Sequence, residues 1–185
     1  FLLPKPISVS HACLGQSFFI FLCLVTLFLS KRWVLGVKAT AGQATHFTRL
    51  AWTTAIFSYC QLIAGAVVRH TGGKGLVVHF FLAAFIVLHV IFLDQKLFKD
   101  RVIQKLFLGH VLCLNGLLVL QLFAGLGAYF FKYALEKGVV PGTPEILFTT
   151  IHQTCGALVL ATLFVLSFSA SRSLVQDPAV HSTSE

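Results

Sequence analysis

Five long apolar runs dominate this sequence and decide which folds are open to it. They extend over residues 7–30, 50–68, 76–93, 106–131 and 146–170. Each is close to or longer than the ~20 residues that a helix needs to cross a hydrocarbon core of about 30 Å. A transmembrane β-barrel would show alternating segments of about 10 residues, whereas residues 80–88 are apolar on every face. The sequence therefore predicts an all-α integral membrane protein with five transmembrane helices.

The composition supports a membrane protein and argues against nucleic-acid binding. Hydrophobic residues make up 57% of the chain and charged residues only 11%, against roughly 25% charged in soluble domains. The formal net charge is +8, but the Lys and Arg residues form short clusters between apolar runs and no basic face. The basic character is therefore better explained by membrane topology than by nucleic acid.

The Lys and Arg residues also predict an orientation. One side of the membrane receives nine of them: Lys31, Arg32, Lys38, Arg49, Lys96, Lys99, Arg101, Lys105 and Arg172. The other side receives five: Lys5, Arg69, Lys74, Lys132 and Lys137. Cytoplasmic loops are enriched in these residues, so the first side and the C-terminus are predicted to be cytoplasmic. Phe1 is then outside, and the absence of Met adds to the expectation that upstream spans are missing.

Histidines are the most informative polar residues in the predicted spans. The topology places His11, His79 and His152 at similar depth near the outer side of three inward-running helices. Each is followed four residues later by a small residue, namely Gly15, Ala83 and Gly156. Positions i and i+4 share a helix face, so each imidazole is expected to lie beside a shallow groove. Ionisable residues inside spans are functional candidates by default.

Two neutral imidazoles on facing helices form a bis-histidine ligand set for a heme iron. We assign His79 and His152 as this pair, and His11 as a third ligand whose partner lies on a missing span. His89 and His110 lie at other depths and are weaker candidates. The alternative is that each histidine only hydrogen-bonds to a neighbouring helix. The five cysteines all fall inside spans and are expected to be packing residues.

A short internal repeat indicates a duplicated architecture. The sequence Gln-Leu-Ile-Ala-Gly at 61–65 recurs as Gln-Leu-Phe-Ala-Gly at 121–125. Both copies lie in outward-running spans, and an inward-running span with an outer histidine follows each. Gln61 and Gln121 are expected to hydrogen-bond across the bundle or line a pocket, and Gly65 and Gly125 to permit close helix approach.

Three segments of the chain resemble the heme A synthase family. They are Val-Ser-His-Ala-Cys-Leu-Gly-Gln at 9–16, Gln-Leu-Ile-Ala-Gly-Ala-Val-Val-Arg-His-Thr-Gly at 61–72 and Ile-His-Gln-Thr-Cys-Gly-Ala at 151–157. Members have eight transmembrane helices in two pseudo-symmetric halves and oxidise the C8 methyl group of heme O to the formyl group of heme A. The resemblance maps this chain onto helices four to eight, with the last four forming a four-helix bundle.

The resemblance also implies roles for particular residues. It assigns His79 and His152 as ligands of a heme b, and His11 as a ligand in the half where the substrate heme O binds. The expected heme pocket comprises Gln61, Gly65, Arg69, Gln121 and Gly156, and the Arg69 cation could hold a propionate. The family's proposed catalytic glutamate would lie in the missing part, so no catalytic residue is assigned and this chain alone is not expected to be catalytic. The loop at 69–75 lacks a cysteine pair that some members carry.

The predicted organisation has three parts. Residues 1–49 hold the last helix of a truncated N-terminal half and a cytoplasmic linker, 50–172 the heme-binding half, and 173–185 a disordered cytoplasmic tail. The resemblance implies a bacterial plasma membrane or a mitochondrial inner membrane. It implies heme O synthase (a farnesyltransferase) and cytochrome oxidase assembly factors as partners. The apolar spans make the lipid bilayer a partner, and a homo-oligomer is left open.

Two other functions remain open from the sequence. A b-type cytochrome membrane anchor could pass electrons to or from quinone through the same histidine pair without modifying heme. A transporter or structural membrane protein, in which the histidines only pack, would bind no heme.

Overall fold

The computed structural model describes residues 4–36, 38–135 and 141–177, and most of them are helical. The elements in chain order are α1 (Lys5–Phe28), α2 (Lys31–Leu35), β1 (Ala39–Ala41), α3 (Ala44–His70), α4 (Leu76–Lys99), α5 (Arg101–Tyr129), the π-helical turn η1 (Phe130–Ala134), α6 (Thr143–Ser173) and β2 (Leu174–Gln176). Within the described residues, five helices are long and apolar enough to cross a membrane: α1, α3, α4, α5 with η1, and α6. The five predicted spans are therefore confirmed by length and composition.

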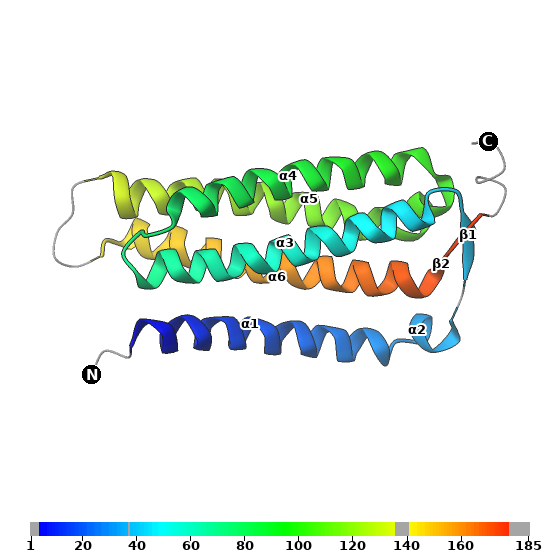
Figure 1. Cartoon of the computed structure of the whole chain (residues 1–185), viewed down its shortest axis with the longest axis horizontal. Helices are drawn as coiled ribbons and strands as arrows, with labels where there is room; N and C mark the ends of the chain where they lie inside the picture. Colours follow the sequence, from blue (N-terminus) through cyan, green and yellow to red (C-terminus); the bar gives the residue numbers. More distant parts are fainter. Residues whose placement is uncertain (1–3, 37, 136–140, 178–185) are drawn as a thin grey trace.

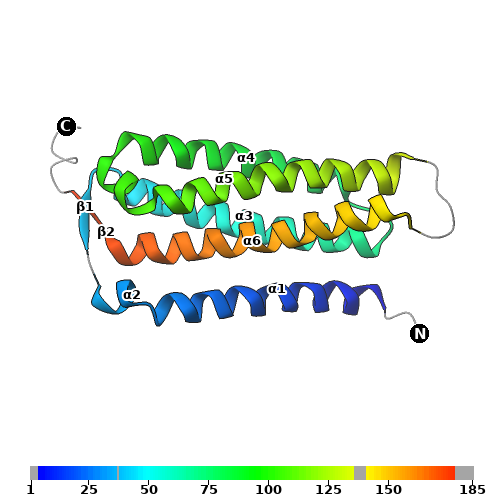
Figure 2. The same cartoon turned by 180° about the vertical axis from the view of Figure 1, so that it is seen from behind.

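Helices α3 to α6 form a closed four-helix ring, and α1 packs outside it (Figures 1 and 2). Each helix of the ring contacts the next one in the chain, and α6 returns to contact α3. Helix α1 lies against α6 and α3, where the Ser17 and Tyr59 hydroxyls are hydrogen-bonded at 2.8 Å. Its only buried residue is Ile20. The four-helix bundle predicted for the last four spans is thus observed, with α1 as a peripheral helix.

The helices run beyond the apolar runs that predicted them. Helix α4 continues to Lys99 and α5 begins at Arg101, so the separator expected at 94–105 shrinks to Asp100. The Asp100 side chain accepts hydrogen bonds from the backbone N–H groups of Val102 and Ile103, which caps α5. Polar residues continue a helix as readily as apolar ones where they reach the interface, because helix propensity does not follow hydropathy.

Asp94, which had been placed in that separator, lies inside α4. Its two carboxylate oxygens accept hydrogen bonds from the Asn115 amide of α5 at 3.0 and 3.2 Å. The opposite turn, between α3 and α4, matches the expected glycine-rich loop, except that Arg69 and His70 belong to α3. Gly73 and Gly75 there have φ of 97° and 84°, a region that residues with a Cβ rarely adopt.

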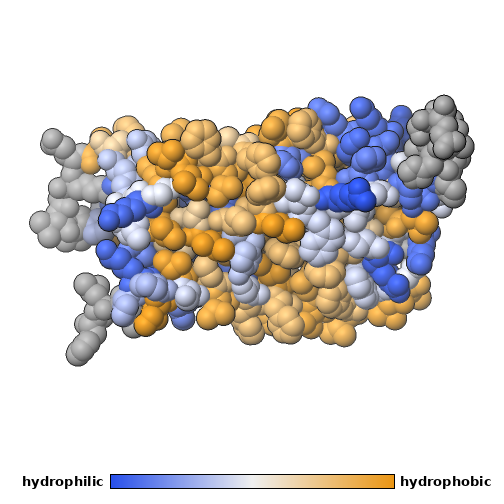
Figure 3. Space-filling model, viewed as in Figure 1, coloured by the Kyte–Doolittle hydropathy of each residue, from blue (hydrophilic) through white to orange (hydrophobic). Residues whose placement is uncertain are grey.

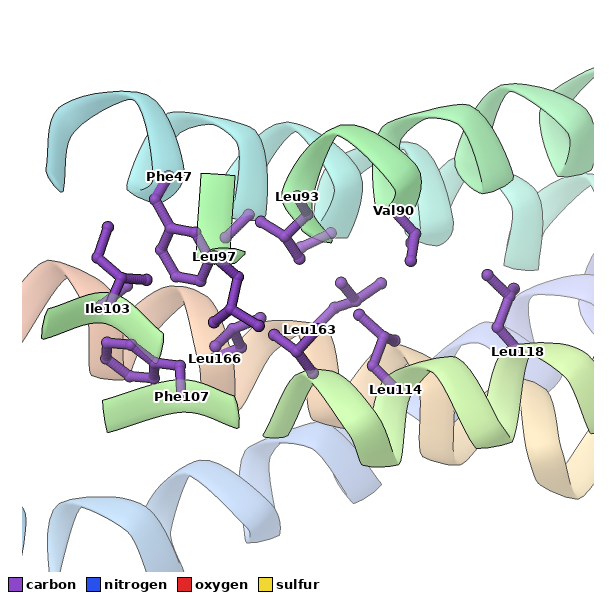
Figure 4. Packing of buried hydrophobic residues seen from close by; sticks show 14 of the residues in the cluster. Phe47, Val90, Leu93, Leu97, Ile103, Phe107, Leu114, Leu118, Leu163 and Leu166 are labelled. Atoms are coloured by element: carbon purple, nitrogen blue, oxygen red, sulfur yellow. The ribbon is translucent and has the colours of Figure 1, made fainter. Parts of the chain in front are cut away.

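The main core fills one half of the bundle. Fully buried side chains from α3, α4, α5 and α6 meet there (Figure 4). Phe47 and Phe107 stack with ring centroids 5.6 Å apart, and Leu97, Leu163 and Leu166 pack around them. All five have 0% exposure. These apolar contacts stabilise the end of the bundle where β1 pairs with β2.

The two short strands tie the start of α3 to the end of α6. Strand β1 pairs in parallel with β2, with Ala39 opposite Leu174 and Ala41 opposite Gln176. The Gln176 amide donates to the Gly42 carbonyl at 2.9 Å and accepts from the Thr45 N–H at 3.0 Å. Residues 174–176 were expected to belong to a disordered tail, and the structure instead orders them by this pairing. The rest of that tail, 178–185, lies outside the described residues.

The surface agrees with a membrane-embedded bundle. Hydrophobic residues cover much of the face seen in Figure 3, and the strongly hydrophilic residues gather toward the two ends. We call the end with β1 and β2 the strand end, and the opposite end, where α4 begins, the histidine end. The nine Lys and Arg residues assigned to one side lie at or near the strand end, as the element order shows. All five cysteines are unpaired, and only Cys155 is buried.

Candidate functional site

Two histidine rings face each other inside the histidine end of the bundle. His79 lies in the first turn of α4 and His152 in the third turn of α6. Their ring centroids are 6.1 Å apart and the ring planes meet at 74°. Both side chains are partly buried. The two histidines that the sequence singled out as a pair are therefore the two that the fold brings together.

Gln121 of α5 fixes the His152 ring. The Nδ1 atom of His152 lies 3.0 Å from the backbone carbonyl oxygen of Gln121. A carbonyl can only accept, so Nδ1 donates and carries the proton of the neutral ring. The Nε2 atom is then a free base, and the Gln121 side-chain amide lies 3.4 Å from it as a donor. This is the tautomer that a metal ligand needs, oriented by a backbone carbonyl.

Gln61 of α3 repeats the arrangement at His79. The Gln61 amide nitrogen lies 3.4 Å from Nε2 of His79, so Nε2 is again the acceptor and Nδ1 carries the proton. That Nδ1 is buried without a hydrogen-bond partner, as are the side-chain oxygens of Gln61 and Gln121. Buried polar atoms are rarely left without a partner. Several buried polar atoms without hydrogen-bond partners around one histidine pair are therefore typical of a ligand-binding site.

Glycines make room for both rings. A Cβ on Gly65 would lie 3.1 Å from Cε1 of His79, and one on Gly125 would lie 2.8 Å from Cε1 of His152. A Cβ on Gly156 would lie 3.0 Å from the Gln121 amide nitrogen. At each of these positions, any residue larger than glycine would therefore force His79, His152 or Gln121 to move. The Gln-Leu-x-Ala-Gly repeat therefore encodes a structural unit in which Gln and Gly on one helix hold the histidine of the next.

Arg69, at the end of α3, reaches the neighbourhood of the pair from the surface. Its guanidinium donates a hydrogen bond to the side-chain oxygen of Gln153, the residue after His152. Arg69 is exposed, and the guanidinium has further N–H groups for an anion. Arg69 therefore lies at the surface beside the histidine pair, which is compatible with its predicted place in a cofactor pocket.

His11 does not join the pair. It lies exposed on α1, and no ring contact or hydrogen bond links it to His79 or His152 among the described residues. His89 donates a hydrogen bond from Nδ1 to the Phe85 carbonyl oxygen of its own helix, at 2.9 Å. His110 contacts the Phe107 ring. Both contacts lie within the residue's own helix, whereas the alternative interpretation expected a hydrogen bond to a neighbouring helix.

The donor set fits a heme better than a bare metal ion. The described part of the chain holds no cluster of three or more His, Cys, Asp or Glu side chains, whereas a protein site for a bare transition metal usually has three or four ligands. A macrocycle supplies the in-plane ligands itself and asks the protein for axial ones only. His79 and His152 are the two residues that would hold such a group; the 6.1 Å between their ring centroids and the 74° between their planes also lie in the range of an edge-to-face ring contact.

Sequence reasoning missed the polar surroundings of Gln153. Thr150, Gln153 and Thr154 follow one another at helical spacing on one face of α6, and together with Gln16 of α1 they line a cavity. Their i, i+3, i+4 pattern was visible in the sequence. These residues belong neither to the set of histidines nor to the Gln-Leu-x-Ala-Gly repeat, which were the two patterns that marked candidates inside the spans.

In the comparisons with known proteins, the chain matches no protein-family model, no curated protein and no solved structure. The interpretation of the site therefore depends on its own geometry.

Proposed function

We propose that His79 and His152 are the axial ligands of a heme b bound between the four helices at the histidine end. The observation that carries this proposal is the facing ring pair, 6.1 Å between centroids, with the same Gln and Gly support on each side. Packing alone explains one histidine beside a glycine. It does not explain two matched sets that leave buried polar atoms without partners.

The chain's own residues have distinct tasks in this proposal. His152, held through Nδ1 by the Gln121 carbonyl, and His79 would ligate through Nε2, and the long 3.4 Å contacts from the Gln121 and Gln61 amides to these atoms would be given up on binding. Gly65 and Gly125 leave the rings room to settle against the ligand. Arg69, at the rim, would pair with a propionate carboxylate. A bound heme supplies reversible one-electron chemistry at iron, with a potential set by such axial ligands.

We further propose that this bundle serves an oxidoreductase similar to heme A synthase, which oxidises the C8 methyl group of heme O to a formyl group. Support comes from the order of the three segments that resemble this family and from the duplicated Gln, Gly and His unit, which suits a pseudo-symmetric fold. His11 is assigned to the substrate heme in this scheme, and its exposure on α1 leaves it accessible to such a ligand. The orientation in which the strand end is cytoplasmic belongs to the same proposal.

The first test is the reduced-minus-oxidised visible spectrum of the chain purified in detergent after expression with heme available. A sharp low-spin b-type band supports the bis-histidine assignment. A colourless preparation that is helical and monodisperse contradicts heme binding by this chain and favours histidines that only pack.

The second test separates the enzyme from a b-type electron-transfer anchor. A longer chain that includes the three upstream helices implied by the family resemblance would be loaded with heme O under air. Formation of the alcohol or formyl product, detected by mass spectrometry, supports the oxidase. Unchanged heme O together with rapid reduction of the bound heme by a quinol would support the anchor.

A further inference from the structure

A second polar site lies on the other face of α6 from His152. Helices α1 and α6 run side by side in the same direction (Figures 1 and 2). A cavity of about 400 Å³ lies between them, within the range of ~300–1,000 Å³ that is usual for small-molecule sites. His152 and Gly156 face Gln121 of α5, so the cavity is separate from the histidine pair.

The cavity is open and mostly apolar, but four polar side chains line it although both helices are candidate membrane spans. Its polar lining consists of Gln16, Thr150, Gln153 and Thr154, and its apolar lining includes Phe19 and Leu158. Polar side chains inside a span are costly unless they have partners or a function. Four of them from two helices, gathered around one cavity, therefore need an explanation.

The hydrogen bonds of the two glutamines are incomplete in complementary ways. The side-chain oxygen of Gln16 is buried and has no hydrogen-bond partner, so it can accept. The side-chain oxygen of Gln153 already accepts from Arg69, so this side chain offers its amide N–H groups. A hydroxyl group is both a donor and an acceptor and can therefore satisfy either glutamine or both.

We propose that the cavity between α1 and α6 binds the hydroxyl-bearing ring of a lipid-soluble phenol or hydroquinone. The ring lies against Phe19 and Leu158, where an aromatic body finds apolar contacts. A hydroxyl donates to Gln16 and accepts from Gln153, and an apolar tail extends into the surrounding lipid. Arg69 is a positioning residue, because it holds the Gln153 side chain so that the amide is left to donate.

The test compares three ligands with the same carbon skeleton in ring and tail but different hydrogen-bonding groups: a decyl-tailed hydroquinone, its quinone and its dimethyl ether. Binding to the purified chain in detergent would be measured by equilibrium dialysis under anaerobic conditions. The hydroquinone should bind about tenfold more tightly than the ether or the quinone, which cannot donate to Gln16. Equal binding of all three would show partition into an apolar surface and would overturn the proposal.

Variants show whether the discrimination resides in the cavity. Gln16→Leu keeps the approximate size of the side chain and should abolish the preference for the hydroquinone. Gln95→Leu, on an exposed position of α4, is the matched control and should leave the preference unchanged. An unchanged preference in Gln16→Leu would overturn the proposal. Repeating the measurement with His79→Ala separates this inference from the heme proposal, since the cavity does not use that residue.

Discussion

Gln43 at the strand end and Gln121 at the histidine end meet their hydrogen-bonding needs differently. The Gln43 N–H donates to the Asp100 carboxylate at 3.1 Å, and its side-chain oxygen accepts from Lys96 at 3.1 Å. The Gln121 side chain has a long 3.4 Å contact from its amide to His152, and its oxygen is buried without a partner. The side-chain oxygen of glutamine thus has a hydrogen-bond donor at the strand end and none at the histidine end.

The strand end is also more tightly packed than the histidine end. The strand end contains the fully buried Phe47, Leu97 and Phe107, and the strand pair closes it. The histidine end has partly buried rings, glycine contacts and most of the unpartnered buried atoms, in the described residues. Satisfied polar groups and tight packing stabilise a fold, whereas unpartnered groups are typical of a binding site. The strand end therefore stabilises the bundle, whereas the histidine end has the features of a ligand-binding site.

The largest expected effect is the loss of heme from the histidine end. His79→Ala or His152→Ala should each abolish the sharp low-spin band, because a single imidazole leaves the iron without its sixth ligand. His89→Ala is the control and should keep the absorbance, since that ring bonds to its own helix. Both ligand variants should still insert and remain helical by circular dichroism. Full heme retention in both would show that the ligands lie elsewhere.

Substitutions in the core of the strand end should lower the free energy of unfolding. Phe107→Ala removes a fully buried ring that stacks on Phe47. We expect a loss of about 2–4 kcal/mol in the free energy of unfolding, mostly from lost packing, because lipid tails are as apolar as the core. Phe98→Ala, at a position that is 59% exposed on α4, should cost much less. Reversible unfolding in mixed micelles would measure both, and equal losses would remove the distinction between core and lipid face.

The comparison of the ends also shows what the sequence could predict. The five spans followed from apolar runs, since the bilayer sets their length. The meeting of His79 with His152 followed from equal depth and from the repeat, which marks equivalent positions on successive helices. Both signals are properties of long segments, so they hold even when the boundaries of a span are wrong by a few residues.

Other features had no such signal. The pairing of β1 with β2 joins segments of three residues each that lie more than 130 positions apart, and so short a strand has no distinctive pattern. The continuation of α4 through Asp94 was missed because hydropathy marks where lipid ends, which is not where a helix ends. The heme ligation and the enzymatic activity remain predictions.

A smaller effect should come from closing the space beside one ring. Gly125→Ala would place a Cβ 2.8 Å from Cε1 and 2.9 Å from Nδ1 of His152, so the ring must shift from the Gln121 carbonyl. We expect heme affinity to fall about tenfold, as measured by heme titration of the apoprotein. Gly116→Ala on the same helix has nothing within 4 Å of the new Cβ and should bind heme normally. Equal affinity in the two variants would mean that the glycine repeat serves helix packing only.

The smallest expected effect tests whether the two ends are independent. Asp100 caps α5 by accepting from Val102 and Ile103 and also accepts from the Gln43 N–H, so Asp100→Ala leaves three backbone donors to find other partners. Loss of such a cap costs about 1 kcal/mol, whereas Asp100→Asn keeps an oxygen acceptor and should cost less. Neither variant should change heme affinity, because substitutions at distant sites with no shared contacts act independently. If Asp100→Ala weakened heme binding as much as Gly125→Ala, the strand end would be positioning the histidines through the length of the helices, and the division between a stabilising end and a binding end would have to be abandoned.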